Sequence, residues 1–329
     1  MAVTTGAMAQ VTIAGRFDFG QSSVKSTAAT GVVTKTSSLG GASSGATSDR
    51  LTFKGTEDLG GGMTAGFEYT MNLVPDAVNS AISTAREAFI TVGSDIGTLK
   101  VGTFTNVFDG MVNNGWHNTV GTSLNLFPGR TNSAIGYTSP KIGGMSFGII
   151  TMNDKTSVAG VTTQSSKLSG SILSAAYAAG PLSVNVGYGD ASATTSTVLA
   201  MTAITPSSTV ALDLTQLSMK ASYNLGFANV AYMHVDAEAS LGAVSSGFKA
   251  NEVSATFPMG SFTPFVSYNK ADGNGSADTV AYKGTSVGVD YALSKRTYVY
   301  ATTGSKKYST AGVQTTKTSA TVMGLVHSF

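Results

Sequence analysis

Apolar and polar residues alternate along most of this chain with a period of two. In residues 63–72, MTAGFEYTMN, the side chains of Met63, Phe67 and Tyr69 fall on one face, while Thr64 and Glu68 fall on the other. The same alternation recurs in residues 10–21, 50–56, 182–188, 216–225 and 286–293. Successive side chains of a strand point to opposite faces, whereas a helix repeats after about 3.6 residues. The chain is therefore predicted to be all-β.

The composition indicates what the two faces of these strands meet. Charged residues make up 12% of the 329 residues and hydrophobic residues 42%. That is about half the charge of an ordinary soluble domain. No apolar run reaches the roughly 18 residues of a spanning helix. A chain poor in charge but not strongly apolar fits a barrel whose alternate residues face lipid and water. The 39 glycines suit sheets that bend and close.

Short and long connections alternate along the chain as well. The longer polar segments are 22–47, 74–85, 105–131, 153–167, 190–210, 237–248, 271–279 and 306–317. Short turns at one rim and long loops at the other are typical of an outer-membrane barrel. Eight long segments predict a transmembrane antiparallel β-barrel of about sixteen strands, the size at which a barrel encloses an aqueous channel.

Residues 105–131, TNVFDGMVNNGWHNTVGTSLNLFPGRT, break the alternation. The segment is too long for a hairpin turn, and a long irregular segment in a compact domain is usually functional or disordered. It carries apolar anchors, Phe108, Met111 and Trp116 above all, with Leu124, Leu126 and Phe127 near its end. We therefore predict a loop folded inside the barrel. Asp109, the only acid of this loop, is predicted to face a basic wall.

The two ends of the chain carry weaker signals. Ala7-Met8-Ala9 has the small-x-small form of a signal-peptidase site, although the charged and apolar regions that precede such a site are missing. Residues 1–9 are therefore the end of a signal peptide or a disordered terminus, and residues 10–329 form one barrel domain. The last strand ends on an aromatic residue, Phe329, which is similar to the signal that outer-membrane proteins present for assembly. An ordinary apolar final strand is the alternative.

Four stretches carry a resemblance to a known family. They are residues 48–63 (SDRLTFKGTEDLGGGM), 86–93 (REAFITVG), 132–140 (NSAIGYTSP) and 324–329 (GLVHSF). The chain resembles the general porins of β-proteobacteria, the neisserial-type Gram-negative porins, over nearly its whole length. The resemblance implies a homotrimer of sixteen-stranded channels in the outer membrane. It also implies that the third extracellular loop folds inward and narrows the pore, and segment 105–131 occupies the place of that loop.

The resemblance further implies a cluster of arginines on the wall opposite the loop. Arg50, Arg86 and Arg130 stand at matching positions. Relatives often carry arginine where this chain has Thr103, Gly136 and Val326, so the wall is expected to be less basic here.

The alternation itself predicts which charges face the channel. The predicted inward bases are Arg16, Arg50, Lys54, Lys100, Arg130 and Lys220, and the predicted inward acids are Asp18, Glu68, Glu252 and Asp290. By alternation, Arg86 falls on the same face of its strand as Ala88, Ile90 and Val92. That face suits lipid as well as water. A pore selects by its width and by the charges at its narrowest point. Because bases outnumber acids, we predict a weak anion preference; the alternative is scattered charges with little net effect.

Other kinds of chemistry receive little support. A net charge of +2 gives no reason to expect a nucleic-acid partner, and the absence of cysteine removes disulfides and thiol chemistry. His117, His234 and His327 lie on separate segments without metal-ligand spacing. Residues 272–278 open like a calcium loop, but Lys283 stands where the closing acid belongs, which favours a plain hairpin loop. We predict no catalytic residue, no cofactor and no metal.

The predicted function is passive diffusion of ions and small hydrophilic solutes across the outer membrane. A substrate-selective outer-membrane channel is the alternative. An outer-membrane lipase needs a serine and a histidine in a catalytic constellation, and none stands out. A Ser/Thr/Gly-rich adhesin of the solenoid type needs a fixed repeat, whereas the strands here are unevenly spaced. A set of tyrosines is predicted to form interfacial girdles, or otherwise to be ordinary strand aromatics: Tyr69, Tyr177, Tyr188, Tyr223 and Tyr291.

Overall fold

The structure is a computed structural model that describes residues 10–41, 48–74, 82–109, 126–157, 165–193, 212–274 and 280–329. Residues in these ranges form seventeen strands. Within the same ranges, no helix is long and apolar enough to cross a membrane. The strands are β1 (Gln10–Ala28), β2 (Val33–Gly40), β3 (Arg50–Gly60), β4 (Met63–Leu73), β5 (Ile82–Ser94), β6 (Gly97–Thr105), β7 (Arg130–Thr138), β8 (Met145–Ser157), β9 (Ser165–Ala179), β10 (Leu182–Ala193), β11 (Leu212–Asn224), β12 (Asn229–Leu241), β13 (Val244–Thr256), β14 (Phe262–Gly273), β15 (Val280–Ala292), β16 (Thr297–Thr310) and β17 (Val313–Ser328).

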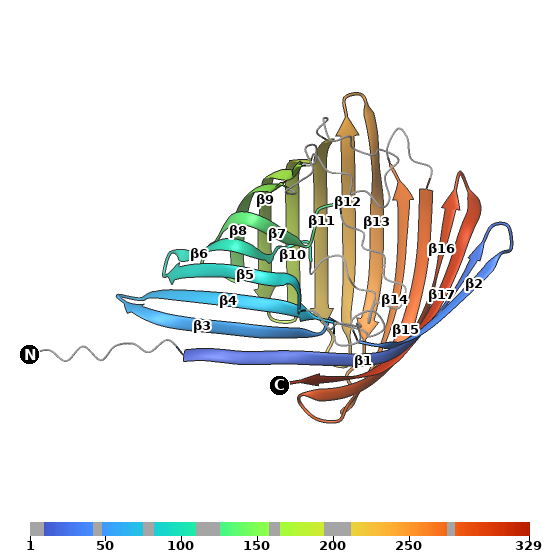
Figure 1. The fold of residues 1–329 in the computed structure, drawn as a ribbon, viewed down its shortest axis with the longest axis horizontal. Coiled ribbons are helices and arrows are strands. Elements are labelled where there is room, and N and C mark those ends of the chain that lie inside the picture. The colour runs from blue at the N-terminus through green and yellow to red at the C-terminus, as the bar shows by residue number, and fades with distance from the viewer. Residues whose placement is uncertain are drawn as a thin grey trace, which may run out of the picture.

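The sheet closes on itself because β17 returns to β1. These two strands pair antiparallel from Arg16 opposite Ser328 to Ala28 opposite Thr316. On its other edge, the long β1 pairs with β3 through its first half and with β2 through its second half. Since β2 and β3 share one place in the ring, the seventeen strands occupy sixteen positions (Figure 1). The prediction of an all-β antiparallel barrel of about sixteen strands is confirmed.

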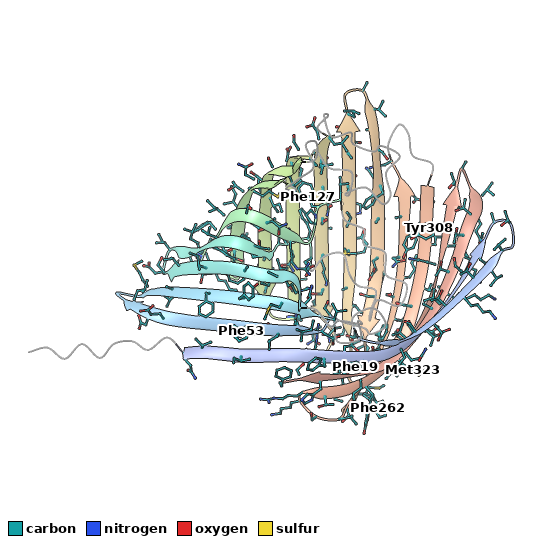
Figure 2. All side chains as sticks on the ribbon, in the orientation of Figure 1. Phe19, Phe53, Phe127, Phe262, Tyr308 and Met323 are labelled. Carbon is teal, nitrogen blue, oxygen red and sulfur yellow. The ribbon has the colours of Figure 1, made fainter. Side chains whose placement is uncertain are left out.

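The alternation of the sequence places one set of residues on the outer face of the barrel and the other set on its inner face. Large apolar residues such as Ile13 and Ile90, whose side chains are 60% and 61% exposed, cover the outer face. Phe19 and Met323 lie on that face as well (Figure 2). Among the tyrosines predicted for the girdles, Tyr69, Tyr188, Tyr223 and Tyr291 are exposed and Tyr177 is half-buried. An exposed apolar belt around a closed barrel is what a lipid-facing surface requires.

The prediction of a long loop is wrong for three of the eight segments. Segments 22–47, 237–248 and 306–317 contain strand hairpins, with short turns at residues 29–32, 242–243 and 311–312. Their serines and threonines still pair across strands, as the hydroxyls of Ser22 and Ser38 do at 3.2 Å. Segments 22–47 and 306–317 are mostly polar on both faces, so they have little hydrophobic contrast and the pattern conceals their strands.

The inner face differs between two parts of the ring. A buried apolar cluster lines the inside of β8–β15, and we call it the apolar arc; it includes Met152 on β8, Ile172 on β9, Leu214 on β11, Met233 on β12 and Tyr282 on β15. Charged side chains instead line the inside of β1 and β3–β6, and we call these the basic arc: Arg16, Arg50, Lys54, Arg86 and Lys100. The two arcs face one another across the barrel.

Candidate functional site

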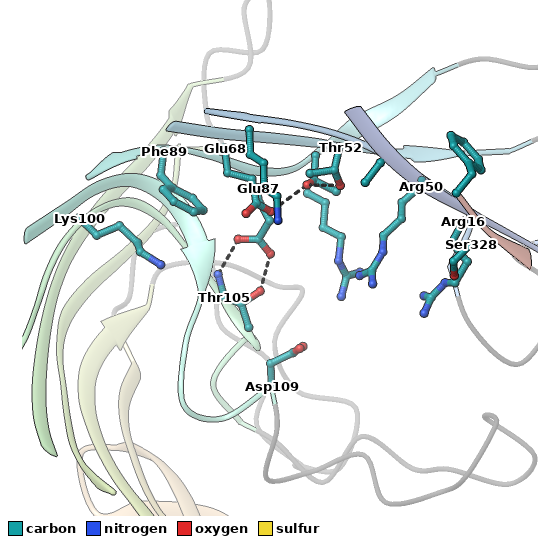
Figure 3. Close-up of a pocket in the computed structure, with 16 residues that line it drawn as sticks. Arg16, Arg50, Thr52, Glu68, Glu87, Phe89, Lys100, Thr105, Asp109 and Ser328 are labelled. Carbon is teal, nitrogen blue, oxygen red and sulfur yellow. Dashed lines mark hydrogen bonds between the residues drawn. The ribbon is translucent and has the colours of Figure 1, made fainter. Parts of the chain in front are cut away.

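A charged cavity of about 580 Å³ opens inside the barrel against the basic arc. All five bases of the arc line it, together with three acids, Glu68, Glu87 and Asp109. Figure 3 shows Arg16, Arg50 and Lys100 reaching into the same open space as Asp109. The cavity therefore brings together six of the seven residues predicted for the constriction. The seventh, Arg130, lies beside it.

Arg16 and Arg50 stand directly opposite one another on β1 and β3. Arg16 donates from Nε and Nη2 to the carbonyl oxygen of Ser48, at 3.3 and 3.1 Å, which fixes its guanidinium group. Like charges directly opposite in a sheet destabilise it, so this pair carries a cost in folding stability. Such a pair leaves a concentrated positive field in the cavity.

A β-bulge brings Arg86 into the same cavity. Thr70 on β4 pairs with Glu87 on β5, while the next residue, Met71, pairs with Ala85, so Arg86 is the extra residue. A bulge locally re-aims a side chain. Both Arg86 and Glu87 line the cavity. Strict alternation groups Arg86 with lipid-facing residues, and one unpaired residue is enough to overturn that grouping.

Two lysines complete the basic arc, each with its own neighbour. Lys54 on β3 lies directly opposite Glu68 on β4. The Nζ of Lys100 lies 4.2 Å from the ring centroid of Phe89 and 5.3 Å from that of Phe104. A cation over an aromatic face is attracted by the ring quadrupole. These neighbours hold the lysine side chains on the wall.

Glu87 connects the arc to both ends of the segment between β6 and β7. Its carboxylate accepts hydrogen bonds from the backbone nitrogen of Thr105, at 2.9 Å, and from the Thr105 hydroxyl (Figure 3). One of its oxygens also lies 3.7 Å from Nε of Arg130. Thr105 ends β6 and Arg130 begins β7. The sequence gives no sign of the role of Glu87, because the alternation does not show which inward acid attaches to another segment.

Asn106 ties the two described ends of that segment together. Its side-chain amide donates to the carbonyl of Pro128 at 2.8 Å, and its backbone nitrogen donates to the carbonyl of Gly129 at 3.0 Å. Its Oδ1 accepts from the backbone nitrogen of Phe108 at 2.9 Å. The chain therefore leaves β6 and returns to β7 through one closed stem.

Phe108 and Phe127 fix this stem to the apolar arc. Both side chains are buried and their ring centroids are 5.4 Å apart. They pack on Gly187 and Gly189 of β10, where a Cβ on Gly189 would lie 2.9 Å from the Phe127 ring. Only glycine leaves room for rings this close to the strand. Phe108 was among the predicted anchors; Met111 and Trp116 lie outside the described residues, as do Leu124 and His117.

Gln216 on β11 adds a polar attachment. Its Oε1 accepts hydrogen bonds from the backbone nitrogens of Leu126 and Phe127, at 2.8 and 3.1 Å. Its own amide donates to the Ser218 hydroxyl at 2.9 Å, and the Gln216 side chain is fully buried. In a ring of sixteen positions, β10 lies eight positions from β1. The stem is therefore attached to the wall diametrically opposite Arg16.

The wall is expected to be less basic at three positions, Thr103, Gly136 and Val326. The ring of Phe104 covers Gly136, and a Cβ there would lie 3.0 Å from it. Val326 is fully buried. Thr103 is half-buried and faces the irregular register between β6 and β7. None of these positions adds a charge to the cavity.

The remaining predicted inward charges line other parts of the inner face. Asp18 accepts a hydrogen bond from the Tyr300 hydroxyl at 2.9 Å, and Glu252 accepts one from Asn269 at 3.4 Å. Lys220 lies opposite Asn185, and Asp290 opposite Tyr300. No group of His, Asp or Glu among the described residues is arranged to hold a metal ion.

Phe329 closes the seam of the barrel. Its backbone exchanges two hydrogen bonds of 3.0 Å with Gly15 of β1, and its ring lies 5.9 Å from that of Phe17. His234 shares a hydrogen bond with Asn251, and His327 shares one with Thr297. Of segment 272–278, for which a plain hairpin loop is predicted, residues 272–274 are described, and Asp272 forms an ion pair with Lys270.

A closed barrel with an apolar outside, a charged cavity inside and a stem (residues 105–109 and 126–130) attached to its inner walls defines a membrane channel. Comparisons with known proteins agree. Residues 1–311 match the family model described as Gram-negative porin, and the chain belongs to this family. It is an integral protein of the outer membrane and forms a diffusion channel there. The family and the fold point to a channel rather than an enzyme.

Individual relatives extend over nearly the whole chain. Outer membrane porin protein 32 of Delftia acidovorans is 26% identical over 338 residues, which cover 95% of this chain and 90% of that protein. The anion-selective porin from Comamonas acidovorans superposes with a TM-score of 0.73 at 23% identity, covering 98% of this chain and 100% of that one. OmpT of Vibrio cholerae in its trimer form gives a TM-score of 0.69 at 13% identity, covering 98% and 99%.

Proposed function

We propose that this porin is a homotrimeric channel with a weak anion preference, which is set where the segment between β6 and β7 meets the basic arc. In this proposal Arg16, Arg50 and Arg86 provide the attraction and Asp109 the facing negative charge. The observation that carries the proposal is that three arginines from three strands line one cavity. Residues 10–329 form the single barrel domain in this proposal, and residues 1–9 lie outside the described residues.

The balance of charge in the cavity supports the anion preference. Five bases and three acids line it, which leaves a net charge of +2. Low-dielectric walls focus such a field and concentrate ions of the opposite sign. Lys54 and Lys100 are partly offset by Glu68 and by aromatic rings, so the preference is expected to be weak. The relative from Comamonas acidovorans is named for anion selectivity, which is consistent with this sign.

The proposal of a trimer rests on a structurally similar protein. The similar outer membrane protein OmpT from Vibrio cholerae is known in a trimer form. Oligomers of one chain usually close with cyclic symmetry, and three barrels side by side each keep their own channel. We propose that Met111 and Trp116, with Phe108, hold the segment in place. We also propose that Arg130 steadies it through Glu87, and that Phe329 serves as the assembly signal.

The zero-current potential of the purified protein in a planar bilayer tests this function. With a KCl gradient across the bilayer, we expect the potential to have the sign of chloride preference and to decline as the total salt rises, because salt screens the arginines. Channel openings are expected in groups of three. A potential with the sign of potassium preference would contradict the selectivity, and single openings only would contradict the trimer.

A further inference from the structure

The outer surface carries a row of lysines that the channel function does not use. Lys283 on β15 stands directly opposite Lys307 on β16, and Lys307 stands directly opposite Lys317 on β17. Lys270 on β14 extends the row, because it is the partner of Lys283 on the other side. Four neighbouring strands, which lie side by side in Figure 1, thus place lysine at one level on one face.

Direct opposition of like charges makes this row unfavourable by itself. Neighbouring strands are about 4.8 Å apart, and like charges opposite one another destabilise a sheet. Lys270 has a partner, because it forms an ion pair with Asp272. The described residues of β15, β16 and β17 carry no acid on their outward faces. Lys25 on β1 lies opposite Lys35 on β2 and Ser319 on β17, and so adds two more bases near the row.

The row lies at the upper edge of the lipid-facing belt. Lys283 is on the outward face of β15 with Val287 and Tyr291, both exposed. From Tyr291 to Lys283 the strand rises about 27 Å, and a tilt near 45° makes this about 20 Å of height, close to the belt of about 25 Å in such barrels. The short turns at 257–261 and 293–296 lie at the other end of these strands. The segment between β6 and β7, which takes the place of an extracellular loop in this class, leaves the barrel at the lysine end, because β6 and β16 run in the same direction. The lysines therefore lie at the outer leaflet.

Hydroxyl groups fill the zone between the lysines and the apolar belt. The side chains of Thr285 and Ser305 approach to 3.4 Å, and those of Thr303 and Thr321 to 3.1 Å. From the outside inward, the surface therefore offers ammonium groups, then hydroxyls, then apolar side chains. A lipid with phosphates above, sugar and ester oxygens in the middle, and acyl chains below matches this order.

We propose that Lys283, Lys307 and Lys317 bind the phosphates of lipopolysaccharide, the phosphorylated glycolipid of the outer leaflet. Lysine binds phosphate as a point charge, and a charge-assisted hydrogen bond is about twice as strong as a neutral one. A phosphate seated on the row replaces the mutual repulsion of the lysines with attraction. The site would couple the barrel to its surrounding lipid on the side formed by β15–β17.

Purified protein in detergent, titrated with fluorescent bisphosphorylated lipid A, tests this proposal. The variant K283Q/K307Q/K317Q removes the row, and K141Q/K295Q/R296Q removes three bases from exposed turn residues at the opposite rim. Each lysine near an anionic surface contributes roughly five-fold, so the row variant should bind on the order of a hundred-fold more weakly. The rim variant should bind like the parent. Heat-resistant migration in SDS verifies that each barrel is folded.

Further variants and competitors show whether charge alone is enough for binding and whether the phosphate must belong to a lipid. K283R/K307R/K317R keeps the charge and should retain binding, which also covers a row variant that fails to fold. Lipid A without phosphates should bind weakly, and millimolar inorganic phosphate should not compete. Undiminished binding by a folded row variant would overturn the proposal. Efficient competition by inorganic phosphate would also overturn it, as would disulfide cross-linking between copies through K307C, because the row would then be a free-anion site or an interface.

Discussion

The basic arc and the apolar arc come from the same alternating strands and have opposite contents. On β1, β3 and β5 the inward positions hold Arg16, Arg50 and Arg86 around a charged cavity. On β10 and β11 they hold Gly187, Gly189 and Gln216, which receive the rings and backbone of the inward segment. The wall that carries the bases and the wall that holds most of the stem are thus different, with Glu87 as the attachment on the charged side. We therefore expect that some substitutions change the width of the pore and others change its ion selectivity.

The largest effect is expected from removing the segment itself. Replacing residues 110–125 with a short Gly-Ser link keeps the stem closed by Asn106 and leaves every strand intact. Because a wider pore conducts more, single-channel conductance should rise at least about two-fold while the barrel stays heat-resistant. Unchanged conductance would mean that the segment does not narrow the channel.

The next largest effect should follow from releasing the segment from the apolar arc. Replacing a buried phenylalanine with alanine costs about 3–5 kcal/mol, and Phe108 and Phe127 are both buried. F108A/F127A should give a channel whose current fluctuates between two levels, whereas F147A, at an exposed outer position, should not. Recordings at constant voltage make this comparison. Equally steady currents in both variants would place the attachment elsewhere.

A smaller effect is expected at Glu87, which lines the cavity beside the basic arc and also holds the stem. Hydrogen bonds to a charged group contribute about 1.5–3 kcal/mol, so E87A should loosen Thr105 and raise current noise. E87Q keeps an acceptor and removes one negative charge, so it should mainly strengthen the anion preference. E57Q, at an exposed position of β3, is the matched control for both. Identical potentials for E87Q and E57Q would count against a role for Glu87 in the cavity.

The smallest effect is expected at Asp109. D109N removes the negative charge that faces the arginines while the stem bonds through Asn106 remain. The zero-current potential should move modestly toward chloride, and conductance should hardly change. A shift toward potassium would show that Asp109 does not act as a facing charge.

The fold could be predicted from sequence because the lipid imposes a strict rule on every strand. Alternation, short turns and the absence of a spanning helix are enough to indicate a barrel of about sixteen positions. The alternation is lost where a strand does not contact lipid. In 22–40 both faces are polar, so the hairpin of β1 and β2 resembles a loop.

The candidate site could be predicted in part. Parity correctly groups Arg16, Arg50 and Lys54 on the inner face, where they line the cavity. It fails at Arg86, because a bulge adds one residue and no sequence signal shows where the register slips. It also gives no sign of Glu87 or Gln216 as attachments, since their partners are backbone groups of residues distant in sequence.

The most direct test of the division between the arcs is the zero-current potential of R16Q/R50Q/R86Q in a KCl gradient. The variant leaves two bases and three acids in the cavity, so its net charge falls from +2 to −1. We expect the potential to cross from chloride preference to potassium preference, with the segment still in place and steady currents. The rim variant K141Q/K295Q/R296Q should keep the parent potential. A potential that is the same in the arginine variant and the parent would contradict the basic arc as the source of selectivity.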